Sequence, residues 1–376
     1  MAVRKRGKTW VVDLSFTNRQ GKAERIRQGG FKKKKDAEDY ELEIKRKIKS
    51  GIELSTPDLS LYEYFEKYIR LYVEGKVAIA TENKYRDTLK SIDKYFPFAT
   101  LKKTSTEEYQ EGLNEYAKTH AKGTTRKFHG LIRTAIKRAM MNRDIEYDFT
   151  QGAIISGAKD EKKTSEKYIS EKDLNKFLRF VEEKFDPRYA NSYMIYIAGL
   201  TGLRYGELLG LTWNDIDFDN HTIDINKEWD YKNTHGFTKN KTLFSPRKIK
   251  VTKKMIRVLD NYKMGQQEQL ERLDKENPFN LVFFNVFTGV PDNKGTNDRL
   301  KEYLQKLNIS PLITFHGLRH THASVLFRNK MSVPSISKRL GHKNTEITYS
   351  TYIHIIKEME EDDSKLVINI LEKVGN

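Results

Sequence analysis

Apolar residues recur along this chain with two different periods, and the periods divide it into parts. Residues 9–16 alternate apolar and polar side chains and are rich in β-branched and aromatic residues, which predicts a strand. Turn residues at 18–21 predict a return as a second strand over 22–27, with a third short strand around 30–31. A helix over 34–50 is then expected to offer this sheet an apolar face formed by Ala37, Tyr40, Leu42 and Ile44.

Residues 59–155 show the period of amphipathic helices throughout, and Ser60 is a suitable N-cap for the first of them. The polar stretch 158–167 lacks any period and predicts a linker. From Tyr168 onward the pattern is again mainly helical, with one sheet at 216–251 whose strands are expected at 222–226 and 247–251. The pattern therefore predicts a mainly α protein with small β-sheets, an α+β fold in several domains.

Charge changes this picture by suggesting a partner. The chain has 69 Lys and Arg against 52 Asp and Glu, a formal net charge of +17, and residues 1–50 alone carry 16 against 7. An excess of this size favours a polyanionic partner such as nucleic acid, although a basic surface kept for solubility is the alternative. The absence of cysteine excludes disulfides, thiolate metal sites and cysteine nucleophiles. With no signal peptide and no run of roughly 18 apolar residues, a soluble intracellular protein is expected, with no membrane partner.

The most informative polar pair is His316 and Arg319, which lie three residues apart and so share one face of a helix. Both can reach one anionic group, and the planar fork of arginine fits two oxygens of a phosphate. A metal site is the competing interpretation, because His316 and His320 are four residues apart. Gly317 stands where a zinc protease has its glutamate and Arg319 would repel a cation, so no metal is expected. Buried, hydrogen-bonded core histidines are the alternative for His320 and His322.

Four short motifs together resemble the tyrosine recombinases of the phage-integrase family: Thr201–Gly210, His316-x-x-Arg319, Leu340-Gly-His342 and Tyr352-x-His354. The resemblance implies an enzyme that cuts and rejoins DNA through a phosphotyrosine, without metal, ATP or other cofactor. It makes Tyr352 the nucleophile and Glu207 a supporting acid. The other catalytic residues that it implies are Arg204, Lys241, His316, Arg319 and His342.

Two of these assignments leave alternatives open. Tyr349 rivals Tyr352 by spacing, although Tyr352 fits the motif better. Lys239 rivals Lys241, because Lys250 replaces the proline that ends the family's lysine motif, whose Arg position is taken here by Arg247. A tyrosine of ordinary pKa near 10 is a poor nucleophile at neutral pH, so it needs a base, for which the resemblance suggests His316.

The resemblance extends beyond the catalytic motifs. It implies an arm-type DNA-binding domain over 1–56, a helical core-binding domain over 57–157, and a catalytic domain over 168–376 that ends in a helix exchanged between protomers. The DNA-contacting residues expected in the first two domains are Arg4, Lys5, Arg6, Lys8, Arg25, Arg27, Lys32, Lys33, Arg126, Lys127, Arg133 and Lys137.

The function implied is that of a site-specific integrase that integrates and excises a prophage or another mobile element. Its partners would be double-stranded attachment sites, three further copies of the chain in a tetramer, and an excision factor or host DNA-bending protein. It would act in the bacterial cytoplasm, at the nucleoid. A type IB topoisomerase and a non-catalytic DNA-binding regulator are the alternative functions. The sequence does not distinguish a phage from a conjugative element as the origin of the chain.

Overall fold

The computed structural model describes residues 2–17, 21, 23–49, 58–158, 164–238, 246–349 and 351–352. The chain forms two compact units, residues 1–161 and 162–376. Within the described ranges, no helix is long and apolar enough to cross a membrane.

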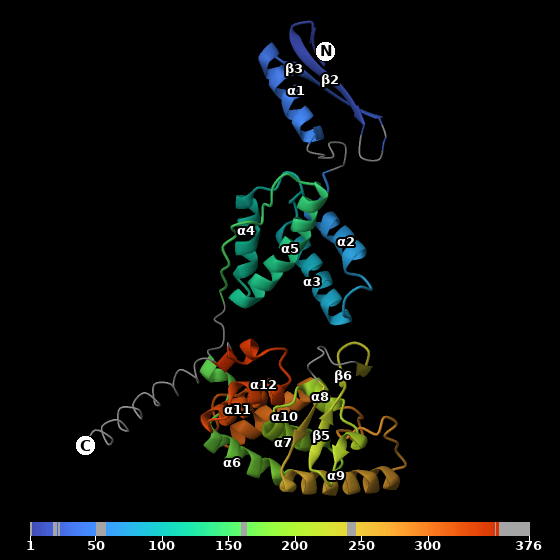
Figure 1. Ribbon diagram of the computed structural model, residues 1–376, viewed down its shortest axis with the longest axis vertical. Coiled ribbons are helices and arrows are strands. Elements are labelled where there is room, and N and C mark those ends of the chain that lie inside the picture. Colours follow the sequence, from blue (N-terminus) through green and yellow to red (C-terminus); the bar gives the residue numbers. More distant parts are fainter. Residues whose placement is uncertain are drawn as a thin grey trace, which may run out of the picture. The chain divides into compact units, whose positions relative to one another are not determined.

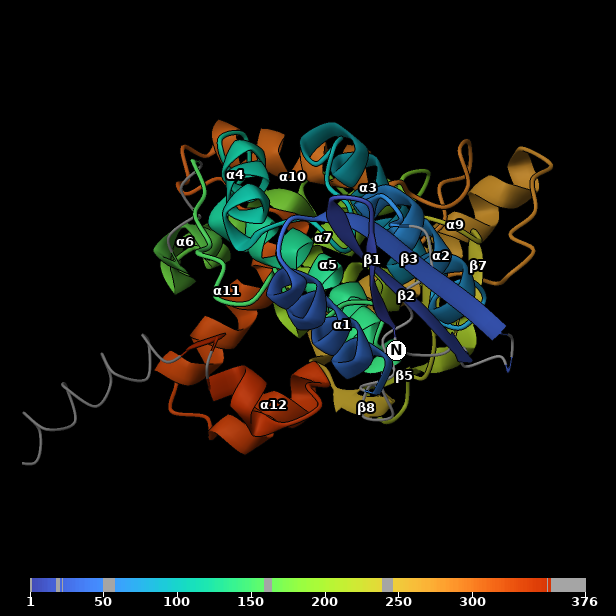
Figure 2. The ribbon, with the colours of Figure 1, turned by 90° about the horizontal axis from the view of Figure 1, so that it is seen from above.

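The N-terminal residues form a three-stranded antiparallel sheet in the order β1 (Val3–Arg6), β2 (Thr9–Thr17) and β3 (Ala23–Phe31), with α1 (Lys34–Lys49) packed against all three strands (Figures 1 and 2). A three-stranded sheet with a helix is as expected, but the strands differ from the prediction. The additional strand comes first, at β1, and β3 is continuous.

The glycine pair at the end of β3 explains the error. Gly30 has a φ of 96° at a register shift opposite Trp10 and Val11, so it forms a bulge within β3 where a new strand was predicted. The predicted helix face is also wrong at Leu42, which is 50% exposed, while Ala37 and Ile44 are buried. Residues 37, 40 and 44 share a face at helical spacing, and position 42 points away from it.

Between residues 58 and 158 the structure describes four helices: α2 (Leu61–Tyr72), α3 (Ile79–Tyr95), α4 (Thr106–Ala117) and α5 (Lys122–Asn142). Ser60 is the N-cap of α2, as expected, in a capping box with Glu63. Their apolar stripes meet in one core that includes Phe65, Tyr109 and Ile132. The expected helical run to 155 is too long, because α5 ends at Asn142 with the next residue in the left-handed region (φ 60°).

The second unit is built around α7 (Ala190–Thr201), which is almost completely buried. Within the described residues, four helices contact it: α6 (Glu171–Glu182), α8 (Tyr205–Leu209), α10 (Asn293–Lys306) and α11 (Phe315–Arg328). The other α-helices among the described residues of this unit are α9 (Lys253–Arg272) and α12 (Val333–Leu340). Because α7 ends at Thr201, three residues before Arg204, this buried helix fixes the position of the predicted arginine.

The predicted sheet is present in the second unit. β5 (Thr222–Ile225) pairs with β4 (Ile216–Asp217) and with β8 (Arg247–Lys250), and the register sets Ile225 opposite Arg247. The segment between β5 and β8 also forms a second hairpin, β6 (Glu228–Asp230) and β7 (Gly236–Thr238). Lys239 and Lys241 lie outside the described residues, and so does the proposed exchange helix.

Candidate active site

A pocket of about 250 Å³ in the second unit brings together three parts of the chain that are far apart in sequence. They are the start of α8, one face of α11, and the segment that follows α12. The residues that line it are Arg204, His316, Arg319, His320, Gly341, His342, Lys343, Ile347, Thr351 and Tyr352. Five of the six predicted catalytic residues therefore share one pocket, and the sixth, Lys241, lies outside the described residues.

α11 supplies His316, Arg319 and His320 from one face, since these positions are three and four residues apart. The guanidinium of Arg319 is buried and donates hydrogen bonds to the carbonyls of Gly202 (2.8 Å) and Leu340 (2.7 Å). Burial and the charge of Arg204 lower the pKa of Arg319 to about 9, so it remains cationic at neutral pH. The two carbonyls thus fix a cation at the pocket wall before any substrate binds.

Arg204 caps α8 and is the more accessible of the two pocket arginines, with its side chain 32% exposed. It donates to Glu207 Oε1 (2.7 Å) and to the carbonyl of Gly341 (3.2 Å). The turn before Arg204 contains Gly202, whose φ is +68°. A Cβ at this position would come within 2.9 Å of His322 and Leu340. The turn that presents Arg204 therefore requires glycine.

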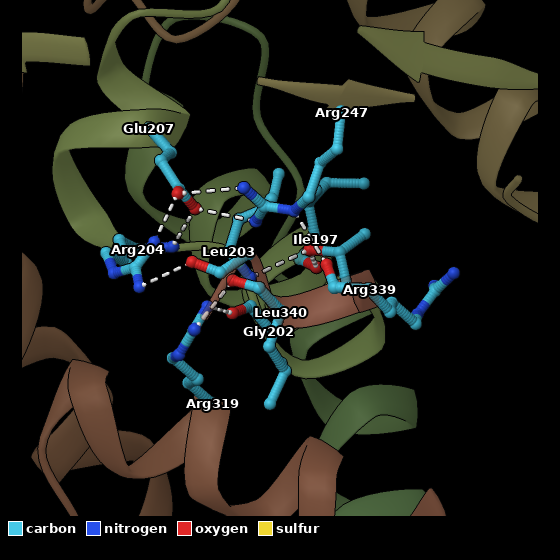
Figure 3. A network of polar contacts seen from close by, with 11 residues as sticks. Ile197, Gly202, Leu203, Arg204, Glu207, Arg247, Arg319, Arg339 and Leu340 are labelled. Carbon is cyan, nitrogen blue, oxygen red and sulfur yellow. Dashed lines mark hydrogen bonds and ion pairs between the residues drawn. The ribbon is translucent and has the colours of Figure 1, made fainter. Parts of the chain in front are cut away.

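Glu207 is fully buried and binds two arginines (Figure 3). Arg247, from β8, donates to both of its oxygens at 3.0 Å. Arg204 donates to Oε1 through its side chain and to Oε2 through its backbone N–H (2.8 Å). Burial raises the pKa of this carboxyl, but the hydrogen bonds from Arg247 and the charges of Arg247, Arg204 and Arg319 outweigh it and hold the pKa at about 2. Glu207 is thus a permanent anion that orients two cations.

Arg247 is not among the residues that the sequence motifs predict for the site. Its Nε donates to the carbonyl of Arg339 (2.7 Å), at the end of α12, so it ties β8 to the segment that carries His342. A Cβ at Gly341 would lie 2.5 Å from its guanidinium, so this contact also requires glycine. The only feature of the sequence that points to Arg247 is its position in the lysine motif.

His342 donates or accepts a hydrogen bond through Nδ1 with the hydroxyl of Thr348 (2.6 Å). Burial and the charges of Arg319 and Arg204 lower the pKa of His342 to about 3. The same causes lower the pKa of His316. Both rings are accordingly neutral at physiological pH in the absence of an anion.

Tyr352 is buried and lines the pocket. The ring lies 5.3 Å from that of Phe327, and the hydroxyl is 3.0 Å from Nδ1 of His320. Burial raises the pKa of Tyr352 to about 12, although the charge of Arg319 opposes this. The rival Tyr349 is 45% exposed and does not line the pocket.

The core interpretation was open for two histidines, His320 and His322, and their environments in the structure differ. His322 is buried and accepts a hydrogen bond from Arg339 Nε (3.1 Å), which agrees with that interpretation. Burial, with the charge of Arg339, lowers the pKa of His322 to about 3. His320 instead lines the pocket and contacts Tyr352, so the core interpretation is wrong for it.

The predicted DNA-contacting residues of the N-terminal sheet fall on two sides. Cross-strand partners share a face, and the register places Arg4, Arg6, Arg25 and Arg27 on the face without α1. Asp13 lies among them and binds Arg4 (2.9 Å) and Arg25 (2.6 Å). Lys5 pairs with Trp10 and so belongs to the α1 side; Lys8, Lys32 and Lys33 are exposed outside the strands.

On α5, Arg126, Lys127 and Lys137 are exposed, as a surface that binds an anion requires. Arg133 is half-buried, and its Nε lies 3.9 Å from a carboxylate oxygen of Asp148. Arg133 is therefore the least available of these four cations.

Glu207 should also make the second unit sensitive to acid. Its carboxyl titrates near 4.5 ordinarily and near 2 here, so its stabilisation is present above pH 4.5 and is lost as the pH falls towards 2. The shift corresponds to about 3 kcal/mol. Glu207→Gln should therefore have a lower free energy of unfolding than the wild type at pH 7. This gap between the two free energies should narrow as the pH falls from 4.5 towards 2.

Urea unfolding followed by tryptophan fluorescence measures this gap, with Glu302→Gln as the control. Glu302 is a half-exposed carboxylate paired with Lys306, and its loss should change stability little. A gap for Glu207→Gln that stays constant with pH would contradict the account of this carboxylate.

Comparison with known proteins identifies the family to which the chain belongs. Residues 167–359 match the phage integrase family, and residues 2–48 match an arm DNA-binding domain. The integrase of Staphylococcus phage L54a is 27% identical over 351 residues, covering 86% of this chain and 96% of that protein.

Solved structures show the same fold. The Tn1549 transposon integrase in complex with a circular intermediate DNA has a TM-score of 0.64 at 18% identity, over 81% of this chain and 99% of that one. A lambda integrase tetramer bound to a Holliday junction has a TM-score of 0.53 at 15% identity, over 92% and 96%. The fold and the matched region define a tyrosine site-specific recombinase. The chain belongs to the phage integrase family, and it catalyses site-specific recombination of the kind that integrates mobile DNA.

Proposed function

We propose that Tyr352 attacks a DNA phosphate bound by Arg204 and Arg319 of the same chain, giving a 3′-phosphotyrosyl link and a free 5′-hydroxyl. The observation that carries this proposal is the pocket itself, where the tyrosine and both arginines of one chain meet. A 5′-hydroxyl from a partner strand then attacks the link and releases the tyrosine. Since the covalent link conserves the phosphodiester bond energy, neither ATP nor a metal is required for the cycle.

The two arginines stabilise the transition state because their positions are fixed in advance. Negative charge on the non-bridging oxygens grows as the tyrosine attacks, and preorganised donors gain most at that point. Arg319 is held by two carbonyls, and Arg204 is held by Glu207. Glu207 is therefore a supporting residue that acts through Arg204.

His316 and His342 complete the phosphate site. Their lowered pKa values keep them neutral in the free protein, so His316 can accept the tyrosine proton. A bound phosphate adds negative charge beside them, which opposes the effect of the arginines and raises the pKa of both rings, so that His316 becomes a better acceptor of the tyrosine proton. His342, once protonated, donates to a phosphate oxygen.

The experiment that tests this function uses supercoiled plasmids with one or two copies of the element's attachment sites. The proposal predicts a recombined product that requires two sites. Relaxation of the one-site plasmid without any two-site product would support a topoisomerase, and DNA binding without cleavage would support a regulator.

For the leaving group we propose Lys241 as the general acid. A substrate whose bridging 5′ oxygen is replaced by sulfur needs no proton on departure, because a thiolate leaves readily. Lys241→Ala should cleave normal DNA poorly and the sulfur substrate well, in rates measured on nicked duplexes. Lys239→Ala is the matched control, and rescue of that variant alone would transfer the role to Lys239.

We propose a three-part chain, with an arm-type domain at 1–56, a core-binding domain at 57–157 and a catalytic domain from 168, after a linker. Residues 1–56 would bind a second class of site, away from the cleaved core. The support is the helix-free sheet face with Arg4, Arg6, Arg25 and Arg27, together with the match to an arm DNA-binding domain. The exposed cations of α5 would contact the core site.

The arm assignment predicts that replacing these four arginines by alanine abolishes recombination of full attachment sites but spares cleavage of a core-site suicide duplex. The control replaces four basic residues of α1, Lys35, Lys45, Arg46 and Lys49, with the same change in charge. Binding to full sites should also lose salt dependence, by about 0.9 in log–log slope per phosphate contact removed. Equal effects of both quadruple variants would indicate that the basic unit contributes only nonspecific attraction to DNA. A protein of residues 57–376 should behave like the sheet variant.

The working assembly that we propose is a tetramer on two DNA sites, which the tetrameric lambda structure supports. An excision factor or a host DNA-bending protein would set the direction, and excision would reverse integration. The protein would act at the nucleoid in the bacterial cytoplasm, where its DNA substrate lies.

A further inference from the structure

His320 is the residue that holds the hydroxyl of the proposed nucleophile in this structure. Its Nδ1 lies 3.0 Å from the hydroxyl of Tyr352. The resemblance to the recombinase motifs assigns roles to His316 and Arg319, but it assigns none to the residue that follows Arg319.

The geometry of α11 explains how one helix supplies both groups. His316 and His320 are one turn apart, with ring centroids 4.9 Å apart and ring planes nearly perpendicular, at 88°. Both line the pocket, so His320 can hold the tyrosine while His316 remains beside the phosphate site.

The ring of Tyr352 is also fixed. It is buried in a small cluster with Ala323, Phe327, Ile336 and Leu340, so that rotation about the C–O bond is the main freedom left to its hydroxyl. A hydrogen bond to His320 removes that freedom and sets the direction of one oxygen lone pair. An attacking oxygen needs this alignment with the phosphorus.

We propose that His320 is a positioning residue, which holds the hydroxyl of Tyr352 through Nδ1 and aligns it for attack on the phosphate. This proposal rests on Tyr352 being the nucleophile. His320 acts through the tyrosine, and proton acceptance stays with His316.

The test compares His320→Asn with His320→Leu in the full-length protein. The amide of asparagine can occupy the place of Nδ1 and hydrogen bond with the hydroxyl, but it does not titrate near neutral pH. Leucine fills a similar volume without a polar atom. The probe is a nicked suicide duplex that carries the element's core site, cleaved in a single turnover with excess protein.

His320→Leu should slow cleavage about tenfold, the factor that one ordinary hydrogen bond supplies, with unchanged DNA affinity. His320→Asn should restore most of the rate and keep the pH profile of the wild type. Thermal unfolding of both variants, measured in parallel, identifies any loss of rate that comes from misfolding. In that case the ratio of the His320→Asn rate to the His320→Leu rate still shows whether the hydrogen bond to Tyr352 contributes to cleavage.

Two results would overturn the proposal. Wild-type cleavage by His320→Leu would show that the contact has no role. Failure of His320→Asn as complete as that of His320→Leu, or loss of one limb of its pH profile, would make His320 the proton acceptor. Tyr352→Phe in the same assay keeps the two questions separate, because an adduct that persists in it refutes the nucleophile and not the contact.

Discussion

Tyr352→Phe is expected to abolish the covalent protein–DNA adduct while DNA binding remains at the wild-type level. Only the hydroxyl is lost, and the ring keeps its contacts with Phe327 in a buried cluster. The substitution also removes the hydrogen bond to His320. A gel-shift titration and denaturing electrophoresis of the trapped adduct, on the same nicked duplex, measure the two effects separately.

Tyr349→Phe is the matched control for this prediction. It removes the same atom three residues away, from an exposed side chain that does not line the pocket. It should form the adduct at the wild-type rate. Loss of the adduct in Tyr349→Phe, with retention in Tyr352→Phe, would reverse the assignment of the nucleophile.

Arg204→Ala should slow cleavage by about 10²–10³-fold, the effect of removing one preorganised donor from a developing oxyanion. The side chain is one-third exposed, so the substitution leaves little buried space empty. Arg319→Ala should be at least as severe in rate, but it also leaves the carbonyls of Gly202 and Leu340 without their donor. Arg204→Ala is therefore the sharper test of phosphate binding.

Arg188→Ala provides the control for the arginine prediction. Arg188 is also a partly exposed arginine paired with a carboxylate, Asp186, in the same unit, and it does not line the pocket. The comparison holds the change in charge constant. Near-normal cleavage by Arg204→Ala, or an equal loss in Arg188→Ala, would remove Arg204 from the phosphate site.

The parts of the fold that the sequence predicts best are those where one local pattern decides the structure. Ser60 with Glu63 specifies a helix start, and the structure has that capping box. The alternation at residues 9–16 specifies β2. The catalytic motifs are predictable for a similar reason, because His316 and Arg319 lie on one helix and need no long-range information to share a face.

The parts that the sequence does not predict depend on contacts between distant segments. Arg247 joins Glu207 to the end of α12. Arg247 and Glu207 are 40 residues apart, and a local sequence pattern cannot predict a contact at that separation. The contact of His320 with Tyr352 spans 32 positions in the same way. The sequence predicts a separate short strand around Gly30, and only the pairing with β2 identifies this residue as a bulge within β3.

The most direct test of the central claim is to identify the residue that becomes linked to DNA. The full-length protein would be trapped on a nicked suicide duplex with the element's core site, digested with protease and nuclease, and mapped by mass spectrometry. We expect a nucleotide joined through its 3′-phosphate to the peptide that contains Tyr352, at the oxygen of that tyrosine. A nucleotide on Tyr349 or on any other residue, or a link through a 5′-phosphate, would contradict the mechanism.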